Sequence, residues 1–283
     1  MKHAYLIMAH NEPEILSFLV SLLDDARNDI YIHWDIKSGE KPMLVTCHAS
    51  LNWTQRQVDV RWADFSMVDA EYVLFEEANA NGPYAYYHLI SGTDLPAKSQ
   101  DYIHDYCEKH QGQEFIGFAN PSQGEIEWRT QHRFIFTKDL RNTSLLKRVL
   151  RQVYCKVQDL AHYQRNSNIV VKKGPQWVSV TQDFVSYLLE KKDWVFNHFN
   201  HTFCPDEMFI PTICWNSPFK EKVFSLNDEF GSCKRYIKWV NGELLPIEDS
   251  DIDNIKQTEN WFARKFSSKD AALVNEINKM ING

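Results

Sequence analysis

Short apolar runs alternate with longer amphipathic stretches through the N-terminal half of the chain. Residues 4–9, AYLIMA, have the length and composition of a buried parallel strand. Residues 13–25 repeat apolar side chains at helical spacing, and Asn11 with Glu14 resembles a capping box at their start. The pattern therefore predicts a strand and a covering helix as the first unit of the fold.

The same alternation continues along the chain. Further strands are predicted at 29–35, 58–63, 84–92 and 176–181. Helices are predicted at 67–80, 100–110, 144–165 and 182–199, with caps at Ser66 and Asp69, at Ser99 and at Thr181. This order predicts an α/β fold with a doubly wound, mostly parallel sheet, in a single domain with an elaborated C-terminal half.

Polar residues follow the first four predicted strands. In doubly wound sheets, ligands bind beyond the carboxyl ends of the strands. Those ends carry short polar stretches at 9–11, 35–38, 62–64 and 91–94. The sequence has neither GxGxxG nor GxxxxGK[ST], which argues against a dinucleotide dehydrogenase and a P-loop NTPase. We therefore expect a polar rim suited to a nucleotide whose phosphates are met by side chains.

Composition narrows the class of protein. The 283 residues carry a net charge of −7, and the pI near 5.9 argues against a nucleic-acid partner. Six scattered cysteines without a CxxC pair indicate reduced thiols in a cytoplasmic protein. No apolar run reaches the length of a membrane span, and the N-terminus turns polar too soon for a signal peptide.

The predicted helix at 144–165 combines an apolar stripe with several basic side chains. We expect the stripe to pack on the core and the basic face to lie in solvent, as in most surface helices. The alternative is peripheral contact with an anionic membrane at its inner face.

Two adjacent carboxylates, Asp206 and Glu207, lie among apolar neighbours in the segment CPDEMF at 204–209. Pro205 suits a first helical turn, and acids there complement the helix dipole, so a helix start is the simpler explanation. The other explanation is a general base at the wall of a site. Enclosure by apolar residues would then make Glu207 a better proton acceptor.

Seven segments together resemble the core-2/I-branching glycosyltransferase family, which includes β-1,6-N-acetylglucosaminyltransferases and peptide O-xylosyltransferases. They are AYLIMAHNEPE, IYIHWDIKS, YYHLISGTDLPAKS, GPQWVSVTQDFVSYLL, CPDEMFIPTI, KRYIKW and NWFARKF, in order from residue 4 to residue 266. The resemblance implies one GT-A-type nucleotide-sugar-binding domain over residues 1–283. Its nucleotide-binding half is expected at 1–120, and its acceptor-binding and catalytic half at 121–283.

The family's reaction implies roles for several of these residues. It is an inverting transfer from a UDP-sugar, with N-acetylglucosamine as the first choice, to a hydroxyl of a glycan or lipid-linked oligosaccharide acceptor. The resemblance places the general base at Glu207 and leaves Asp206 to cap the helix or orient its neighbour. The family generally needs no metal or other cofactor, so basic side chains are expected at the diphosphate. These are Lys265 and Arg235, with Arg264 as the fallback.

The resemblance also implies contacts with nucleotide and acceptor. The residues expected at the nucleotide are Ala9, His10, Asp35 and Asp94. Those expected at the acceptor are Glu127, Trp128, Arg129 and Trp239. A carboxylate at Asp35 would accept hydrogen bonds from ribose hydroxyls or a base N–H, and a turn cap is its alternative role. Animal members carry a membrane anchor and a stem, whereas this chain begins at its first strand. We therefore expect a bacterial version that acts in surface polysaccharide or oligosaccharide synthesis.

Two features of the sequence, Gln176 and the motif DSD, bear on alternative functions. The xylosyltransferases have an additional acid at the position of Gln176, which argues against a xylosyl role here. The motif DSD at 249–251 matches the metal-binding Asp-x-Asp of other transferases, but it follows no apolar strand and is expected to be a solvated loop. The alternatives are a xylosyl- or other hexosyltransferase of the same family, a transferase that binds Mn²⁺ through DSD or Asp94, and a non-catalytic sugar-binding module.

Overall fold

A five-stranded sheet forms the centre of the computed structural model, which describes all residues except 140–142, 241–242, 270 and 283. The strand order is β3-β2-β1-β4-β6, with β1 at His3–Ala9, β2 at Asn28–Trp34, β3 at Ser50–Trp53, β4 at Tyr86–Ser91 and β6 at Ser179–Thr181. The first four strands pair in parallel, and β6 pairs antiparallel with β4. This confirms the predicted α/β fold with a mostly parallel sheet.

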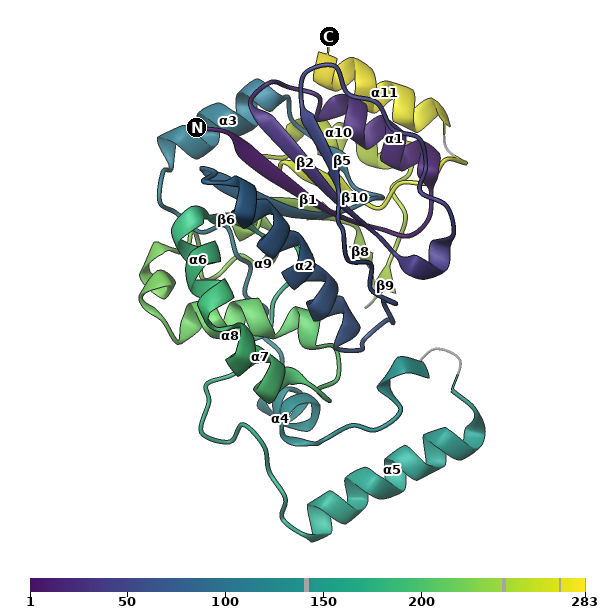
Figure 1. The fold of residues 1–283 in the computed structure, drawn as a ribbon, viewed down its shortest axis with the longest axis vertical. Helices are drawn as coiled ribbons and strands as arrows, with labels where there is room; N and C mark the ends of the chain where they lie inside the picture. The colour runs from purple at the N-terminus through teal and green to yellow at the C-terminus, as the bar shows by residue number, and fades with distance from the viewer. Residues whose placement is uncertain (140–142, 241–242, 270, 283) are drawn as a thin grey trace.

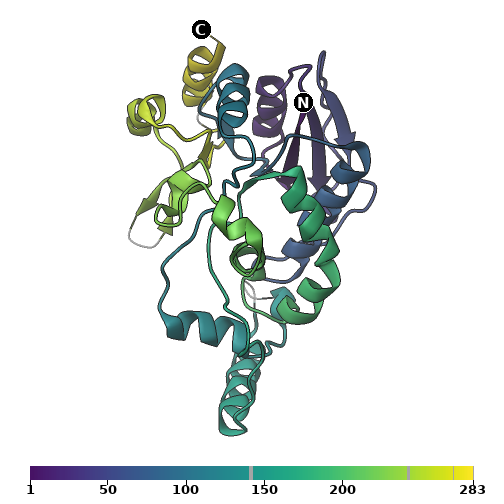
Figure 2. The same ribbon diagram turned by 90° about the vertical axis from the view of Figure 1, so that its left-hand side faces the viewer.

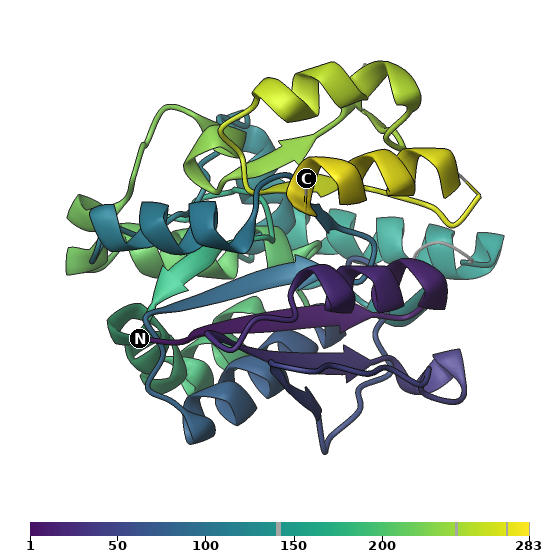
Figure 3. The ribbon, with the colours of Figure 1, turned by 90° about the horizontal axis from the view of Figure 1, so that it is seen from above.

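Helices cover both faces of the sheet (Figure 1, Figure 3). One layer contains α1 (Pro13–Leu22), α3 (Gln100–Lys109), α10 (Ile252–Gln257) and α11 (Ala271–Asn282). The other contains α2 (Ser66–Asn81), α6 (Gln182–Glu190), α7 (Lys192–Phe199) and α8 (Phe209–Trp215). Along β1, Tyr5 and Ile7 face the first layer while Leu6 and Met8 face the second. Burial on both faces explains why this strand reads as an unbroken apolar run.

Smaller elements complete the C-terminal half. A second sheet joins β5 (Leu95–Pro96), β10 (Phe262–Arg264) and β7 (Arg235–Ile237), and a hairpin joins β8 (Trp239–Val240) to β9 (Glu243–Leu244). The remaining helices are α4 (Gln123–Gln131), α5 (Leu145–Leu160) and α9 (Glu229–Ser232). Short 3₁₀ helices are η1 (Ile36–Ser38), η2 (Thr137–Asp139), η3 (Pro205–Glu207), η4 (Pro218–Lys222) and η5 (Asp249–Asp251).

The third strand lies earlier in the sequence than predicted. The prediction of a strand at 58–63 was wrong, because β3 is Ser50–Trp53. β3 is an edge strand with no fully buried residue, so it lacks the apolar run that marks β1. The amide of Val58 instead donates to the side chain of His33 at 2.9 Å, outside any ladder.

Two of the four predicted helix caps form. The hydroxyls of Ser99 and Thr181 accept hydrogen bonds from the amides of Tyr102 and Phe184, as expected at N-caps. The capping box of Asn11 and Glu14 does not form, since the N-cap position of α1 is Glu12 and its side chain makes no cap bond. Ser66 is already the first residue of α2, so it does not cap that helix either.

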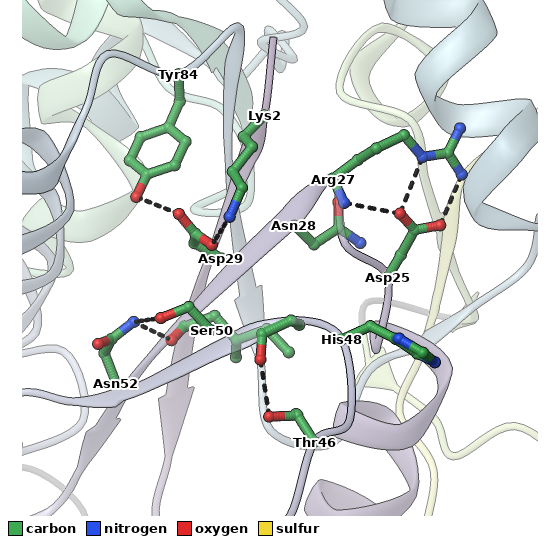
Figure 4. A network of polar contacts seen from close by, with 12 residues as sticks. Lys2, Asp25, Arg27, Asn28, Asp29, Thr46, His48, Ser50, Asn52 and Tyr84 are labelled. Carbon is green, nitrogen blue, oxygen red and sulfur yellow. Dashed lines mark hydrogen bonds and ion pairs between the residues drawn. The ribbon is translucent and has the colours of Figure 1, made fainter.

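Paired polar groups close the amino edge of the sheet (Figure 4). The carboxylate of Asp29 accepts hydrogen bonds from Lys2 at 2.7 Å and from the Tyr84 hydroxyl at 2.8 Å. Arg27 and Asp25 form an ion pair next to it, with 2.6 Å between their closest atoms. The charged groups at this edge therefore bind one another, which leaves the carboxyl edge as the place for a ligand.

The chain makes one long excursion away from these layers. It leaves at the end of α4, forms α5 and returns at Arg165, whose amide donates to the carbonyl of Gln131 at 3.0 Å. Figure 1 and Figure 2 both show α5 apart from the rest of the molecule. The expectation that its apolar stripe packs on the core was wrong, because those side chains are exposed. Among the described residues, no helix has the length and apolar character needed to span a bilayer.

Candidate active site

Residues 173–177, which we call the edge segment, run along the carboxyl edge of the sheet. Because β6 is antiparallel to β4, the residues that lead into β6 lie where the parallel strands end. The side-chain amide of Gln176 accordingly lies 3.4 Å from the sulfur of Met8, near the end of β1. Ligands bind at this edge in open α/β sheets, so the edge segment passes through the expected site.

Glycines hold the edge segment close to two other stretches of backbone. The amide of Gly174 donates to the carbonyl of Glu207 at 2.9 Å. A Cβ on Gly174 would lie only 2.0 Å from the carbonyl oxygen of Gly117, and a Cβ on Gly117 only 1.9 Å from that of Glu229. A larger residue at either glycine would force these backbones apart, so packing requires both glycines.

Glu207 takes part in a ring of four alternating charges, which we call the charge ring. Its Oε2 accepts a hydrogen bond from Nη1 of Arg129 at 2.8 Å and lies 3.7 Å from Nζ of Lys173. Oε1 of Glu125 closes the ring, at 2.9 Å from Arg129 and 3.0 Å from Lys173. Arg129, expected at the acceptor, thus lies beside the expected base. Glu125 and Lys173 were not predicted, and no motif marks them in the sequence.

Asp206 is buried, whereas Glu207 is partly exposed. The side chain of Glu207 is 35% exposed, whereas Asp206 is 7% exposed, and its Oδ1 has no hydrogen-bond partner among the residues described. Desolvation by burial, with the charge of Glu207 adding to it, raises the pKa of Asp206 to about 7. The expectation that apolar neighbours enclose Glu207 was therefore wrong. Asp206 does not cap a helix, because neither η3 nor α8 has a side-chain cap.

A second buried carboxylate, Glu71, lies beneath this pair and was missed in the sequence. It comes from α2, is fully buried, and accepts a hydrogen bond from Nε2 of Gln176 at 2.7 Å. Burial, followed by the charge of Asp206, raises the pKa of Glu71 well above its usual value. A signal existed, since Glu71 is spaced three residues from Val68 and four from Phe75, on the buried face of the helix.

The other end of the edge segment carries Arg264, the fallback diphosphate residue. Its guanidinium lies 4.3 Å from the ring centroid of Trp177, and its Nε lies 3.2 Å from Oδ1 of Asp94. Asp94 is fully buried and also accepts from the amide of Ser91 at 3.0 Å. Burial raises the pKa of Asp94, and the positive charge of Arg264 opposes that rise. Asp94 and Arg264 thus bind each other within the protein.

The two principal diphosphate candidates have different surroundings. Lys265 is half-buried, and its ammonium group has no hydrogen bond or ion pair with any residue that the structure describes. Arg235 is fully buried and donates to four carbonyls, those of Cys233 at 2.7 Å, Val178 at 2.9 Å, Leu89 at 3.1 Å and Lys234 at 3.5 Å. Burial lowers the pKa of Arg235 to about 10. Arg235 therefore ties strands together, whereas the ammonium group of Lys265 is without a partner among the described residues.

The expected nucleotide residues gather where β1, β2 and β4 end. The carbonyl of Ala9 accepts from the amide of Asp35 at 2.9 Å, and a Cβ on Gly92 would lie 2.7 Å from the Cβ of Ala9. The Asp35 carboxylate accepts from the amide of Lys37 at 2.9 Å and from its ammonium group at 2.7 Å. Asp35 therefore takes its alternative role of turn cap. His10 is exposed directly after β1.

Aromatic side chains lie next to the charge ring. Phe203 packs against Trp62 and Trp128, which are 48% and 47% exposed, and the guanidinium of Arg129 lies 5.6 Å from its ring centroid. Trp128 was expected at the acceptor, and Trp62 belongs to the polar rim expected at the ends of the strands. Of the other expected acceptor residues, Glu127 on α4 accepts from Gln123 at 2.9 Å, and Trp239 is exposed on β8.

The acidic motif DSD is used to start a helix. Oδ2 of Asp251 accepts from Nζ of Lys238 and from the amide of Glu248, each at 2.8 Å. In the described part of the chain, potential metal ligands gather in one buried group, in which the ligand atoms lie within 4.8 Å of one another: His3, His88 and Cys107. The two imidazoles there share a hydrogen bond of 3.0 Å, which already explains their approach.

Comparisons with known proteins agree on one family. A family model described as "Core-2/I-Branching enzyme" matches residues 3–267. Xylosyltransferase 2 of Rattus norvegicus is 26% identical over 204 residues, covering 66% of this chain and 22% of the rat protein. Xylosyltransferase 2 of Canis lupus familiaris is 23% identical over 297 residues, covering 97% of this chain and 33% of the dog protein. The chain thus spans between a fifth and a third of the length of these relatives.

A solved structure also matches. It is titled "crystal structure of mouse Xyloside xylosyltransferase 1, apo form" and has 10% sequence identity, with a TM-score of 0.37 over 92% of this chain and 97% of that chain. A likeness this loose says nothing more about the reaction.

Proposed function

The chain belongs to the Core-2/I-Branching enzyme family, and on that premise we propose that it is an inverting glycosyltransferase that moves a sugar from a UDP-sugar to a hydroxyl of a glycan. We assign the general base to Glu207 and the direct diphosphate contact to Lys265. One observation carries the proposal. A partly exposed carboxylate held by two cations lies at one end of the edge segment, and a lysine without a partner among the described residues follows Arg264 at the other.

The chemistry needs one carboxylate. Oε2 of Glu207 is held by Arg129, and Oε1 has no hydrogen bond with any described residue. We assign Oε1 to the acceptor hydroxyl. The carboxylate takes the proton as the hydroxyl oxygen attacks the anomeric carbon, and the bond from that carbon to the diphosphate oxygen breaks. The acceptor gains the sugar and UDP leaves with the bonding electron pair.

Departure of UDP requires positive charge near the diphosphate. Lys265 supplies an ammonium group that can bind phosphate oxygens directly. Arg264 and Arg235 are held by Trp177, Asp94 and backbone carbonyls, so they contribute only through the field of their charges.

We propose that the reaction needs no metal ion. Asp94 is the carboxylate that would hold a metal at this edge of the sheet, and it is buried against Arg264. Binding a divalent cation would require Asp94 to leave that partner. The acids of DSD lie in a separate helix start, where Lys238 engages Asp251.

We propose N-acetylglucosamine as the donor sugar and xylose as the second candidate. The resemblance places an acid of the xylosyltransferases at Gln176, and an amide there cannot act as that acid. The xylosyltransferases among the relatives are the reason to keep xylose in the test. For the acceptor, the exposed faces of Trp62 and Trp128 lie beside the charge ring and suit stacking against sugar rings.

A donor screen tests the proposal. Thermal shift is measured with UDP, UDP-N-acetylglucosamine, UDP-xylose, UDP-galactose and UDP-glucose, and release of UDP is then measured with the donor that stabilises most. We expect stabilisation by UDP and by one UDP-sugar, with UDP release that persists in excess EDTA. Absence of stabilisation by every donor would contradict the proposal. Loss of activity in EDTA, restored by Mn²⁺, would contradict metal independence alone. Binding without turnover would indicate a sugar-binding module.

A further inference from the structure

The excursion presents an unpartnered apolar surface on α5. Its exposed apolar side chains recur at the spacing of one helix face and are Leu145, Leu146, Val149, Leu150, Val153, Val157 and Leu160. We call these residues the α5 stripe. Among the elements that the structure describes, Figure 1 and Figure 2 show none beside most of the helix. Contiguous exposed apolar surface of this kind marks an interaction site in most folded proteins.

The burial of α5 is the reverse of that in an ordinary surface helix. Its buried residues are Cys155 and Gln158, on the side away from the α5 stripe. The side chain of Gln158 accepts from the amide of Arg133 at 2.8 Å and donates to its carbonyl at 3.0 Å. Asp159 pairs with His132 at 2.8 Å on the same side. Polar contacts therefore attach α5 to the protein, while its apolar face points outward.

Charge indicates what covers the α5 stripe. The helix carries four basic residues, Lys147, Arg148, Arg151 and Lys156, against one acid, Asp159. The whole chain has a net charge of −7, so this basic helix stands out from its own protein. At helical spacing Lys156 lies at one margin of the α5 stripe and Lys147 lies beyond the other, toward the polar side. Long side chains there can extend toward anionic groups while the apolar residues are buried.

More positive charge lies where the excursion rejoins the protein. Arg133 and Arg165 help to line a cavity of about 230 Å³. Nη1 of Arg165 is buried without a hydrogen-bond partner in the described part of the chain, and Nη2 donates to the carbonyl of His198 at 3.0 Å. An anionic headgroup would therefore meet cations both along α5 and at its base.

We propose that α5 lies in the interface of an anionic lipid bilayer, with the α5 stripe among the acyl chains and its basic residues at the phosphates. A helix with an apolar face and lysines and arginines on its polar side is the type that binds anionic membranes in this way. A second copy of the chain fits less well, because two α5 stripes packed together would bring the basic edges close to each other.

The position of α5 gives the docking a consequence for the reaction. The excursion starts just after Arg129 and ends before Lys173, the two cations that hold Glu207 in the charge ring. A docked α5 would therefore bring the charge ring near the membrane surface, where a lipid-linked acceptor would be found. The docking itself does not depend on the reaction proposed for Glu207.

Sedimentation with vesicles tests the proposal on the full chain. One set of vesicles contains about one third phosphatidylglycerol in phosphatidylcholine, and the other contains phosphatidylcholine alone. We expect binding to the anionic vesicles that weakens as salt rises, and little binding to the neutral ones. The double variant Leu146→Ser/Val153→Ser should bind at least about tenfold more weakly, and Lys147→Gln/Lys156→Gln should lose the preference for anionic lipid.

The matched control is Met43→Ser/Val45→Ser, which removes two other apolar side chains that are 92% and 74% exposed. It should bind vesicles like the wild type. Light scattering and UDP thermal shift on all variants report association and folding. Failure of the folded wild type to bind anionic vesicles would overturn the proposal. So would a wild-type dimer that becomes monomeric in Leu146→Ser/Val153→Ser. UDP binding and release should stay unchanged in these variants, so loss of docking and failure of the proposed reaction are distinguishable.

Discussion

Two carboxylates at the carboxyl edge are each flanked by two cations, and they differ in burial. Glu207 is held by Arg129 and Lys173, and its side chain is 35% exposed. Asp94 lies near Arg264 and Arg235, and it is fully buried. Glu207 and its two cations are held by ion pairs between side chains of the charge ring. The two cations near Asp94 are held differently, because Arg264 lies over the ring of Trp177 and Arg235 donates to backbone carbonyls.

The contrast separates residues that can change partners from residues that hold the fold. An exposed ion pair contributes little to stability, so its members can bind a ligand at small cost. Removing one member of a buried group leaves charges and carbonyls without partners, which is strongly destabilising. Mutating the charged residues should therefore affect mainly function at one end of the edge segment and mainly stability at the other.

The largest expected effect is on turnover at Glu207. Glu207→Gln keeps the shape of the side chain but cannot accept the proton, so we expect transfer to fall by roughly two to four orders of magnitude. Binding of UDP should remain near normal, because the diphosphate contact is assigned elsewhere. The measurement is UDP release under saturating donor and acceptor, together with UDP affinity by calorimetry.

Asp206→Asn is the matched control, since it changes the adjacent carboxylate in the same way. It should cost much less turnover, because Asp206 is buried and takes no proton from the acceptor. A folded Glu207→Gln protein with wild-type turnover would refute the catalytic assignment. Equal losses in both variants would indicate that the two carboxylates act as a pair.

The next effect is on stability at Arg235. Arg235→Met leaves the carbonyls of Leu89, Val178 and Cys233 without this donor, so we expect a loss of about 3 kcal/mol or more in the free energy of unfolding. Urea unfolding measures it. Lys265→Met is the matched change at a half-buried cation and should alter stability far less. A stable Arg235→Met protein that no longer binds UDP would instead make Arg235 a ligand contact.

Lys265 should show the opposite profile. Lys265→Ala is expected to weaken UDP binding by about 1.5–3 kcal/mol, the value of a charge-assisted hydrogen bond, and to slow transfer. Its urea midpoint should stay close to that of the wild type. Calorimetry with UDP and with uridine separates the effects, because uridine lacks the diphosphate and should bind both proteins equally. Equal UDP affinity of variant and wild type would place the diphosphate elsewhere.

The smallest effect concerns the pH dependence of stability. The pKa of Asp206 rises from 3.8 unfolded to about 7 folded, so the folded state holds a proton that the unfolded state releases. Its contribution to stability is therefore present near pH 4 and is lost as pH rises toward 7. We expect Asp206→Asn to match the wild type at low pH and to exceed it by about 1–3 kcal/mol at pH 8. Parallel stability curves for the two proteins would contradict this.

Much of the sheet could be predicted because its strands are buried on both faces. β1 shows the clearest signal, an unbroken apolar run, and the caps at Ser99 and Thr181 follow from local hydrogen bonding. The prediction of the edge strand β3 failed because a half-exposed strand has a mixed sequence. The apolar residues near Val58, where the strand was predicted, pack without entering a ladder. Local patterns therefore locate the central elements better than the edge.

The errors in predicting the candidate site concern burial. Motifs identified Glu207 and Lys265 as candidates, but no local pattern shows that Arg235 is enclosed or that Asp206 takes the burial expected of Glu207. Lys173 and Glu207 are distant in sequence, and the tertiary structure brings their side chains together. Charge pairing of this kind depends on tertiary structure, so a single sequence does not reveal it.

The hydrogen bond that closes the excursion makes it a separable module. Gln131 and Arg165 are already joined at 3.0 Å, so the stretch between them could be shortened, exchanged or replaced by a brief glycine linker without stretching the backbone. The entropy of closing a loop changes only slowly with its length. Stability should therefore tolerate such a replacement provided that Phe134, which is 1% exposed and packs on Trp128, is kept. Related chains could then acquire different surface attachments by swapping this insertion while the sheet and its carboxyl edge stay the same.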